Sequence, residues 1–511
     1  MGRPFIFPRG DFRPAFPRAH EMTIGNSKVP ALCAVGLILV ALALRIYALG
    51  RLPGVNADEA WYGIAALEFV NGGRFGMVTP NGNLIGPLQF GELVLLHLFF
   101  EPSGAVLRVP SLLSSVGAIA LAYLAGRRIG GASAAWLAML IMAVLPINIA
   151  YARLGWDPSH SGLLILLATC LLLGGSRIGS AVVFAGALMV HPTNLFAAPF
   201  LLLLRAGQAF EEEGDHKIRA IRIYAIMLLA VVAFYYAIRA GSDAMTDPSQ
   251  VARRLVDLGQ YAEFARLFGD LLTGETVYLY LVGKGMGSIA APLAWLTIGL
   301  LALLLLRGIN FRRFDLKQAV LLGWVASLGA FFILAGPIAI RPHFERYGFV
   351  LIAPTALAMA VMVAPYAARR WFQWLAAATA SAALAGFLLF FVLPLSKGTD
   401  EAHRSFRTGP VEPKAAAATA LRSLATKGPI EVLPEDYWLH LPVDYLLQDQ
   451  GIRLRWRPDE PALDASGAPH AYWLVWSDSE TERRVRAAGL HRLVWASEDP
   501  RGRQVRIWQP K

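Results

Sequence analysis

The sequence is short of charge. Only 16% of its 511 residues are Asp, Glu, Lys or Arg, and 56% are hydrophobic, whereas soluble domains usually carry about 25% charged residues. This deficit indicates an integral membrane protein. The net charge of +11 does not indicate a nucleic-acid partner, because most Lys and Arg stand in short clusters beside apolar runs and lack interleaved aromatics.

Other features are also scarce. The two cysteines, Cys33 and Cys170, lie inside apolar runs, which favours small core residues over a disulfide or a metal site. We find no internal repeat. The apolar run from Val29 to Leu49 is too long for a signal peptide and has no cleavage site after it, so we expect it to remain as a helix. Residues 1–28 are predicted to be a disordered cytoplasmic tail.

Apolar runs of spanning or near-spanning length recur through residues 29–395. They begin near Val29, Val106, Ala132, Ser161, Ser180, Asn194, Ile221, Tyr278, Lys317, Tyr347 and Trp374. Basic clusters such as Arg127-Arg128 and Arg369-Arg370 follow alternate ends of these runs. All of them are cytoplasmic if the N-terminus is cytoplasmic and about eleven helices span the membrane. The predicted fold class is therefore a polytopic α-helical membrane protein.

This topology requires residues 50–105 to form one long outer loop. The apolar segment from Pro87 to Phe100 is short and carries Glu92 and His97, so we expect a helix that lies in the membrane interface rather than across it. A second interfacial helix is predicted from Asp58 to Val70. At His191-Pro192-Thr193 the chain forms either the tip of a re-entrant hairpin or the turn between two short spans.

After Leu395 the composition becomes polar, and residues 396–511 predict a small α/β domain that lies on the outer side by parity. A helix is expected from Glu412 to Thr426. The predicted short strands are Pro429–Val432, Ile452–Trp456, Tyr472–Trp476, Arg492–Trp495 and Val505–Trp508. This domain contains no nucleophile elbow, phosphate loop or zinc-ligand spacing, so we expect a scaffold or a lid.

Asp58-Glu59 is the most informative pair. Because charge in hydrocarbon costs several kcal/mol, both carboxylates must lie at the membrane surface, on the predicted outer side. The other polar residues that the topology brings to that side are Arg153, Asp157, His191, Lys284, Arg341, His343, Glu345, Arg346 and Tyr347. Carboxylates that face several cations beside a bilayer suit chemistry on a lipid-linked phosphate, since Arg and Lys hold phosphate and a carboxylate activates a hydroxyl.

Each of these residues also has a structural alternative. Lys284 at a span end can extend to lipid headgroups. Asp58 and Asp157 can cap helices. His191 can hydrogen-bond a broken helix end, and Glu345 can pair locally with a neighbouring arginine.

The segment Asp58-Glu59-Ala-Trp-Tyr resembles the Asp-Glu motif in the first outer loop of the GT-C glycosyltransferases. The dolichyl-phosphate-mannose protein mannosyltransferases and the bacterial lipid A aminoarabinose transferases are the most similar groups. Further similarities follow in order: Gly86-Pro87-Leu88 where the family often has Pro-Pro-Leu, Arg108 to Gly117, Leu145 to Asp157, and Arg346-Tyr347 with Pro354. The Lys or His that some members have near Pro-Pro-Leu is missing, and Asn83 is the nearest polar residue.

This resemblance implies a membrane glycosyltransferase. The donor would be a polyprenyl-phosphate-linked sugar and the acceptor a lipid, glycan or protein, with inversion at the sugar. Asp58 would be the base, Glu59 would orient Asp58 or the acceptor, and the outer arginines would hold the phosphate. No metal is required, although Asp58, Asp157 and His191 resemble a divalent-cation site of oligosaccharyltransferases.

The expected location is a bacterial inner or plasma membrane, in contact with its lipids, with the active site and C-terminal domain on the outer side. A secondary transporter or flippase is the main alternative. It predicts mid-membrane charges and an internal repeat, whereas the charges here concentrate at span ends. A non-catalytic assembly scaffold would leave Asp58-Glu59 unexplained.

Overall fold

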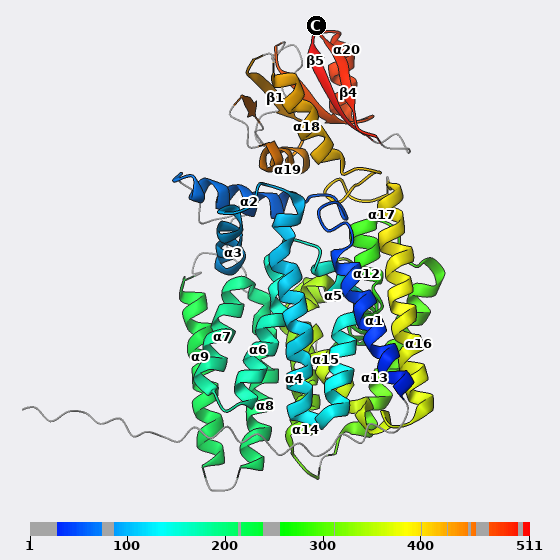
Figure 1. The fold of residues 1–511 in the computed structure, drawn as a ribbon. Coiled ribbons are helices and arrows are strands. Elements are labelled where there is room, and N and C mark those ends of the chain that lie inside the picture. Colours follow the sequence, from blue (N-terminus) through cyan, green and yellow to red (C-terminus); the bar gives the residue numbers. More distant parts are fainter. Residues whose placement is uncertain are drawn as a thin grey trace, which may run out of the picture.

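The computed structural model describes residues 28–73, 86–212, 216–238, 256–310, 312–399, 401–426, 428–447, 451–455, 470–498 and 504–511. They form a helical bundle with a small α/β domain at one end (Figure 1). The predicted N-terminal tail before residue 28 and Asn83 lie outside the described residues.

The bundle is built from helices of very different lengths. They are α1 (Lys28–Ile46), α4 (Gly104–Val144), α5 (Pro146–Tyr151), α6 (Ser161–Leu173), α7 (Arg177–Val190), α8 (Ala198–Glu211), α9 (Lys217–Ile238), α11 (Leu258–Thr273), α12 (Glu275–Val277), α13 (Ala290–Gly308), α14 (Leu316–Leu334), α15 (Ile352–Val363), α16 (Arg370–Phe387) and α17 (Leu393–Lys397). Six helical stretches among the described residues are long and apolar enough to cross a membrane. The larger number of about eleven spans stays a prediction, because it also counts shorter apolar helices such as α6 and α7.

Helix α4 contains two of the predicted runs. Its 41 residues would extend about 60 Å as a straight helix, twice the thickness of a bilayer core. The chain leaves helical geometry at Gly130 and Gly131, where Gly131 has a φ of 75°. A Cβ on Gly126 would lie 2.7 Å from the Ala134 carbonyl oxygen, so the two arms approach closely just beside the bend.

The span expected near Tyr278 begins later than predicted. The apolar helix runs from Gly287 to Gly308. Before it, Gly283 adopts a left-handed φ of 83°, and the Glu275 carboxylate accepts a hydrogen bond from the Met286 amide at 2.7 Å. These two features interrupt the helix, although the sequence is apolar there.

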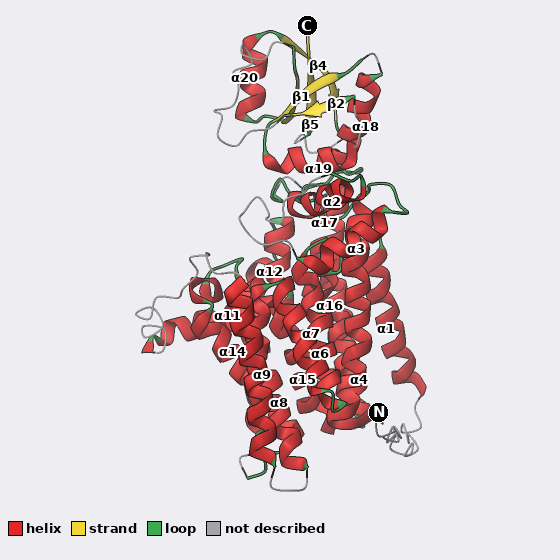
Figure 2. Cartoon of the chain, turned by 90° about the vertical axis from the view of Figure 1, so that its left-hand side faces the viewer, coloured by secondary structure: helices red, strands yellow, loops and turns green. Residues whose placement is uncertain are grey.

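Helices α2 (Ala57–Val70) and α3 (Pro87–His97) occur where interfacial helices were predicted. Helix α2 lies across the end of the bundle, between it and the C-terminal domain (Figures 1 and 2). Asn56 caps α2 by accepting from the Asp58 amide at 2.7 Å, and Glu59 accepts from the Asn56 amide at 2.7 Å. Asp58 is therefore not the capping residue, and its carboxylate is not engaged by the helix end.

The C-terminal domain has a five-stranded sheet in the order β2-β1-β3-β5-β4. The strands are β1 (Ile430–Pro434), β2 (Ile452–Leu454), β3 (Tyr472–Trp476), β4 (His491–Ala496) and β5 (Val505–Pro510), and the helices are α18 (Pro413–Ala425), α19 (Tyr437–Leu447) and α20 (Glu480–Ala488). Strands β2, β1 and β3 are parallel, whereas β5 and β4 pair antiparallel. All five strands overlap their predicted positions.

This domain shares a hydrophobic core with α2. Buried side chains of α18 and α19, including Leu421 and Tyr445, belong to one cluster with Val55, Ala60 and Leu93. The contact between the domain and the bundle is therefore built like a protein interior.

Gly63 on α2 is a close point of this contact. A Cβ there would lie 2.5 Å from the Tyr445 ring and 2.7 Å from Leu107. We expect Gly63→Ala to destabilise the docked domain by about 1–3 kcal/mol through overpacking. Limited proteolysis in detergent measures this as faster release of the C-terminal domain. Gly91→Ala on α3, where a Cβ meets open space, is the control, and equal cleavage rates would contradict the prediction.

Candidate active site

A cavity of about 240 Å³ lies where α2, the α6–α7 region, η6 (Glu345–Leu351) and α19 meet. Its lining combines two carboxylates, one imidazole, one guanidinium and many aromatic rings. The polar and aromatic residues of the lining include Asp58, Trp61, Tyr62, Tyr151, Trp156, Asp157, His191, Thr193, Tyr280, Arg346, Tyr347 and Tyr437. The sequence prediction placed Asp58, Asp157, His191, Arg346 and Tyr347 on one side of the membrane, and here they surround one space.

Asp58 stands at the boundary between α2 and the C-terminal domain. Its Oδ1 accepts a hydrogen bond from the Tyr437 hydroxyl at 3.2 Å. Burial is the main cause that raises the pKa of Asp58; the Tyr437 hydrogen bond and the nearby Arg346 oppose the shift, and Glu59 adds to it. Asp58 is thus a half-buried carboxyl group with an enhanced affinity for a proton.

Asp157 is held from two sides. The Tyr62 hydroxyl donates to Asp157 Oδ2 at 2.6 Å and accepts from the Gly86 amide at 2.9 Å. Behind it, the buried His160 lies with Nδ1 3.1 Å from the Asp157 carbonyl oxygen and Nε2 2.7 Å from Glu92 on α3. Helix α3 therefore supports the second carboxylate of the cavity.

Arg346 carries the only permanent positive charge among the described residues that line the cavity. Its guanidinium lies 4.0 Å from the centroid of the Tyr280 ring and 4.8 Å from that of Tyr347, so aromatic faces fix its position. The His191 ring stacks on Tyr347 with 5.8 Å between centroids, and His191 Nδ1 lies 2.7 Å from the Thr193 hydroxyl.

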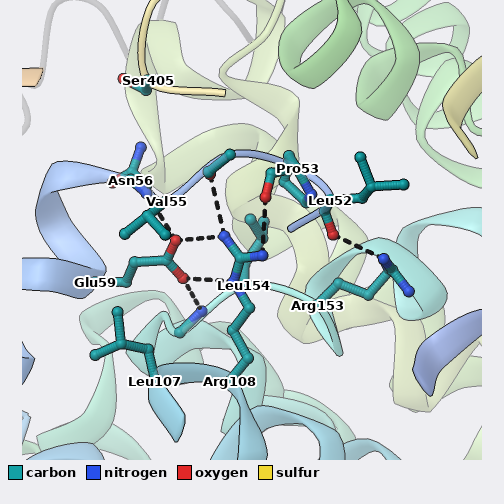
Figure 3. A network of polar contacts seen from close by, with 12 residues as sticks. Leu52, Pro53, Val55, Asn56, Glu59, Leu107, Arg108, Arg153, Leu154 and Ser405 are labelled. Atoms are coloured by element: carbon teal, nitrogen blue, oxygen red, sulfur yellow. Dashed lines mark hydrogen bonds and ion pairs between the residues drawn. The ribbon is translucent and has the colours of Figure 1, made fainter. Parts of the chain in front are cut away.

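Glu59 does not line the cavity, unlike its neighbour Asp58. Its side chain is fully buried and pairs with Arg108, with 2.6 Å between Oε1 and Nη2 and 3.0 Å between Oε2 and Nε (Figure 3). Glu59 also accepts from the Gly155 amide at 2.8 Å. Arg108 donates further to the carbonyls of Leu49, Pro53 and Gly54. Glu59 was expected to orient Asp58 or the acceptor, whereas the hydrogen bonds of its carboxylate go to Asn56, Arg108 and Gly155.

Four predicted cationic or imidazole residues also lie away from the cavity. Arg153 is fully buried and donates to backbone carbonyls, including those of Tyr47 and Leu52, both at 2.7 Å. Figure 3 shows the contact with Leu52. Lys284 and Arg341 are exposed, and Arg341 stacks on Phe344 at 4.7 Å. His343 is half-buried, has a φ of 71°, and offers its carbonyl to Arg346. None of these four side chains lines the cavity.

The described residues do not form a metal centre. Asp58, Asp157 and His191 line the same cavity, but no three acidic, histidine or cysteine side chains in the described part of the chain gather closely enough to hold an ion.

Sequence reasoning missed most of the aromatic lining. Tyr62, Trp156, Tyr280 and Tyr437 come from four separate segments. Tyr62 was within the quoted Asp-Glu motif, and its spacing of one helical turn from Asp58 was the signal that could have identified it. Nothing in the sequence connects Tyr437 to Asp58.

No protein-family model and no curated protein matches this chain. Among solved structures, the Archaeoglobus fulgidus oligosaccharyltransferase, determined with zinc and sulfate, has a TM-score of 0.50 and 15% sequence identity over 93% of this chain and 72% of its own. ArnT from Cupriavidus metallidurans has a TM-score of 0.41 and 13% identity over 94% and 98%. The mycobacterial arabinofuranosyltransferase AftD has a TM-score of 0.42 and 13% identity over 94% and 41%.

These neighbours are GT-C glycosyltransferases. The chain therefore shares the GT-C fold. This assignment rests on the oligosaccharyltransferase, because the TM-scores of ArnT and AftD are lower. The resemblance that the sequence motifs indicated is confirmed at the level of the fold. The apolar helices make the chain an integral membrane protein.

Proposed function

We propose that this chain is a membrane glycosyltransferase that moves a sugar from a polyprenyl-phosphate donor to a hydroxyl of a lipid, glycan or protein on the outer side of the membrane. The observation that carries the proposal is the convergence of Asp58, Asp157, His191 and Arg346 on one cavity at the end of a membrane bundle. Structures of two neighbours contain dolichol phosphate and undecaprenyl phosphate, and the shared fold supports a donor of that class.

In the proposed reaction Asp58 is the general base. Asp58 takes the proton of the acceptor hydroxyl while the hydroxyl oxygen attacks the anomeric carbon. The bond from that carbon to the phosphate oxygen breaks on the opposite face, so the sugar is inverted and polyprenyl phosphate leaves. A carboxylate with a raised pKa suits this role, because general-base catalysis is most efficient when the pKa of the base approaches the working pH.

Arg346 would hold the departing phosphate. Its planar fork can donate two parallel hydrogen bonds to phosphate oxygens, and the surrounding rings fix its direction. Asp157, oriented by Tyr62, and His191 would contact the hydroxyls of the sugar. No metal is needed in this account.

The configuration of the product tests the proposed mechanism. Membranes containing the protein are supplied with polyprenyl-phosphate mannose or arabinose of defined anomeric configuration, and the transferred sugar is analysed by NMR. The proposal predicts inversion. Retention would exclude direct attack by an acceptor that Asp58 activates, because retention requires a second displacement.

Arg346→Gln gives a test of phosphate binding. We expect the KM for the donor to rise about ten- to a hundredfold, because this is the effect of losing a hydrogen bond to a charged group. The rise should be smaller for Arg346→Lys, which keeps the positive charge. Arg341→Gln is the matched control, because Arg341 lies in the same segment but is exposed and outside the cavity. Equal KM values for Arg346→Gln and Arg341→Gln would remove Arg346 from the phosphate site.

A further inference from the structure

A side chain of the C-terminal domain lines the cavity and contacts Asp58. Tyr437 is the first residue of α19, and its hydroxyl donates to Asp58 Oδ1 at 3.2 Å across a sequence separation of 379 residues. Tyr437 also lines the cavity beside Tyr280 and Arg346. Phe406 packs edge-on against Trp156 and Tyr280 from behind, but among the described residues after 395 only Tyr437 lines the cavity. The contact with Asp58 therefore depends on how α19 is docked.

The docking of α19 is held at several points. At its other end the Tyr445 hydroxyl accepts from the Ser103 amide at 3.2 Å and lies 3.3 Å from the Ser103 carbonyl oxygen. In the adjoining α18 the fully buried Lys414 ammonium donates to the carbonyls of Val55 and Ser405 at 2.9 and 3.0 Å. Val55 directly precedes the Asn56 cap of α2. The same anchors therefore fix both α19 and the beginning of the helix that carries Asp58.

We infer that the C-terminal domain completes the active site, with Tyr437 as the positioning residue that holds the Asp58 carboxylate in its ionised, proton-accepting form. The catalytic part of this inference rests on the proposed role of Asp58. It gives the domain a function beyond a scaffold or a lid.

The charges around Asp58 explain why one hydroxyl matters. The titratable or charged groups that act on it from the surrounding elements are Glu59, Tyr62, Asp157, Tyr280, Arg346 and Tyr437. Burial and the two carboxylates favour a protonated Asp58. Arg346 and the Tyr437 hydroxyl favour the ionised form. Burial and Asp58 itself hold the pKa of Tyr437 well above its usual range, so this hydroxyl keeps its proton and acts as a donor, not as a base.

The consequence is a change in pH dependence with a defined sign. A base must be deprotonated, so activity falls as the pH drops through the pKa of Asp58. Removing the Tyr437 hydroxyl removes a contact that lowers this pKa. As the pH is lowered, Tyr437→Phe should therefore begin to lose activity at a higher pH than wild type. At acid pH its rate should be lower than that of wild type by up to about tenfold, because one hydrogen bond shifts a pKa by up to about one unit.

A chemical measurement tests the contact without any enzyme assay. Dicyclohexylcarbodiimide modifies protonated carboxyl groups, and mass spectrometry of the full-length protein in detergent follows modification of the Asp58 peptide against pH. The modification should decline as the pH rises, with a midpoint at higher pH in Tyr437→Phe than in wild type. Tyr472→Phe removes a hydroxyl from β3 in the same domain, away from the cavity, and should leave the midpoint unchanged.

The outcomes separate the inference from the proposed function. An unmoved midpoint in a folded Tyr437→Phe protein, or an Asp58 that reacts at no pH, would overturn the inference. If the midpoint moves but Asp58→Asn transfers sugar at the wild-type rate, the contact stands and the proposed base is wrong. If Asp58→Asn is inactive while Tyr437→Phe keeps both the wild-type midpoint and pH profile, the proposed function stands and the domain contributes no positioning residue.

Discussion

Asp58→Asn should lower the rate of sugar transfer by about 10²–10⁴-fold, the usual contribution of a general base. The amide has nearly the size of the carboxylate and its oxygen can still accept from Tyr437, but it cannot take the proton of an acceptor hydroxyl. Because the Asn56 cap does not use the Asp58 side chain, we expect the variant to fold with wild-type stability. Initial rates with radiolabelled polyprenyl-phosphate sugars in membranes measure the effect.

Asp444→Asn is the matched control for this prediction. Asp444 is a half-buried acid on α19, but it does not line the cavity. Its variant should retain transfer, which separates loss of the base from a general effect of removing a buried negative charge. Asp58→Asn with at least half of the wild-type rate would contradict the assignment of the base.

Glu59→Gln should instead destabilise the protein, by about 3–5 kcal/mol, because it leaves the buried Arg108 without its counter-charge. The ion pair joins the first turn of α2 to α4, and Glu59 also accepts from Gly155. The apparent Tm in detergent, followed by tryptophan fluorescence, measures the loss. Activity would fall with the folded fraction, not through the chemistry of the transfer step.

Two comparisons sharpen this expectation. Glu480→Gln removes an exposed partner of Arg484 on α20 and should cost less than about 1 kcal/mol. The double variant Glu59→Gln with Arg108→Leu should be more stable than the sum of the two single effects predicts, since neither charge is then left alone. Strict additivity, or a Glu59→Gln Tm equal to that of Glu480→Gln, would show that the pair does not hold α2.

Local patterns in the sequence predicted much of the fold. Short segments between turn signals located the strands of the C-terminal domain, and the helices predicted after Gly50 occur as α2 and α3. Apolarity failed near Tyr278, where Gly283 and a contact of Glu275 with the Met286 amide interrupt the helix. Composition does not register such a local backbone feature.

The candidate site was predictable only in part. The predicted outer-side location grouped Asp58 with Arg346, and both line one cavity in the structure. The same criterion also selected Glu59 and Arg153, which do not line it. Both side chains are bound by buried partners that lie far along the chain. Glu59 forms an ion pair with Arg108, and Arg153 donates hydrogen bonds to backbone carbonyls that follow the first helix. Burial and long-range pairing decide whether a charged residue faces a cavity, and neither can be read from its neighbours in sequence.

The fate of a labelled donor distinguishes a glycosyltransferase from a transporter. Proteoliposomes that contain the purified protein, native acceptor extract and polyprenyl-phosphate mannose or arabinose, radiolabelled in the sugar, are analysed for where the label resides. The account predicts that the label leaves polyprenyl phosphate and appears covalently in an acceptor, in wild type but not in Asp58→Asn. Donor that stays intact, or that only crosses the bilayer, would contradict a glycosyltransferase and favour a transporter or flippase.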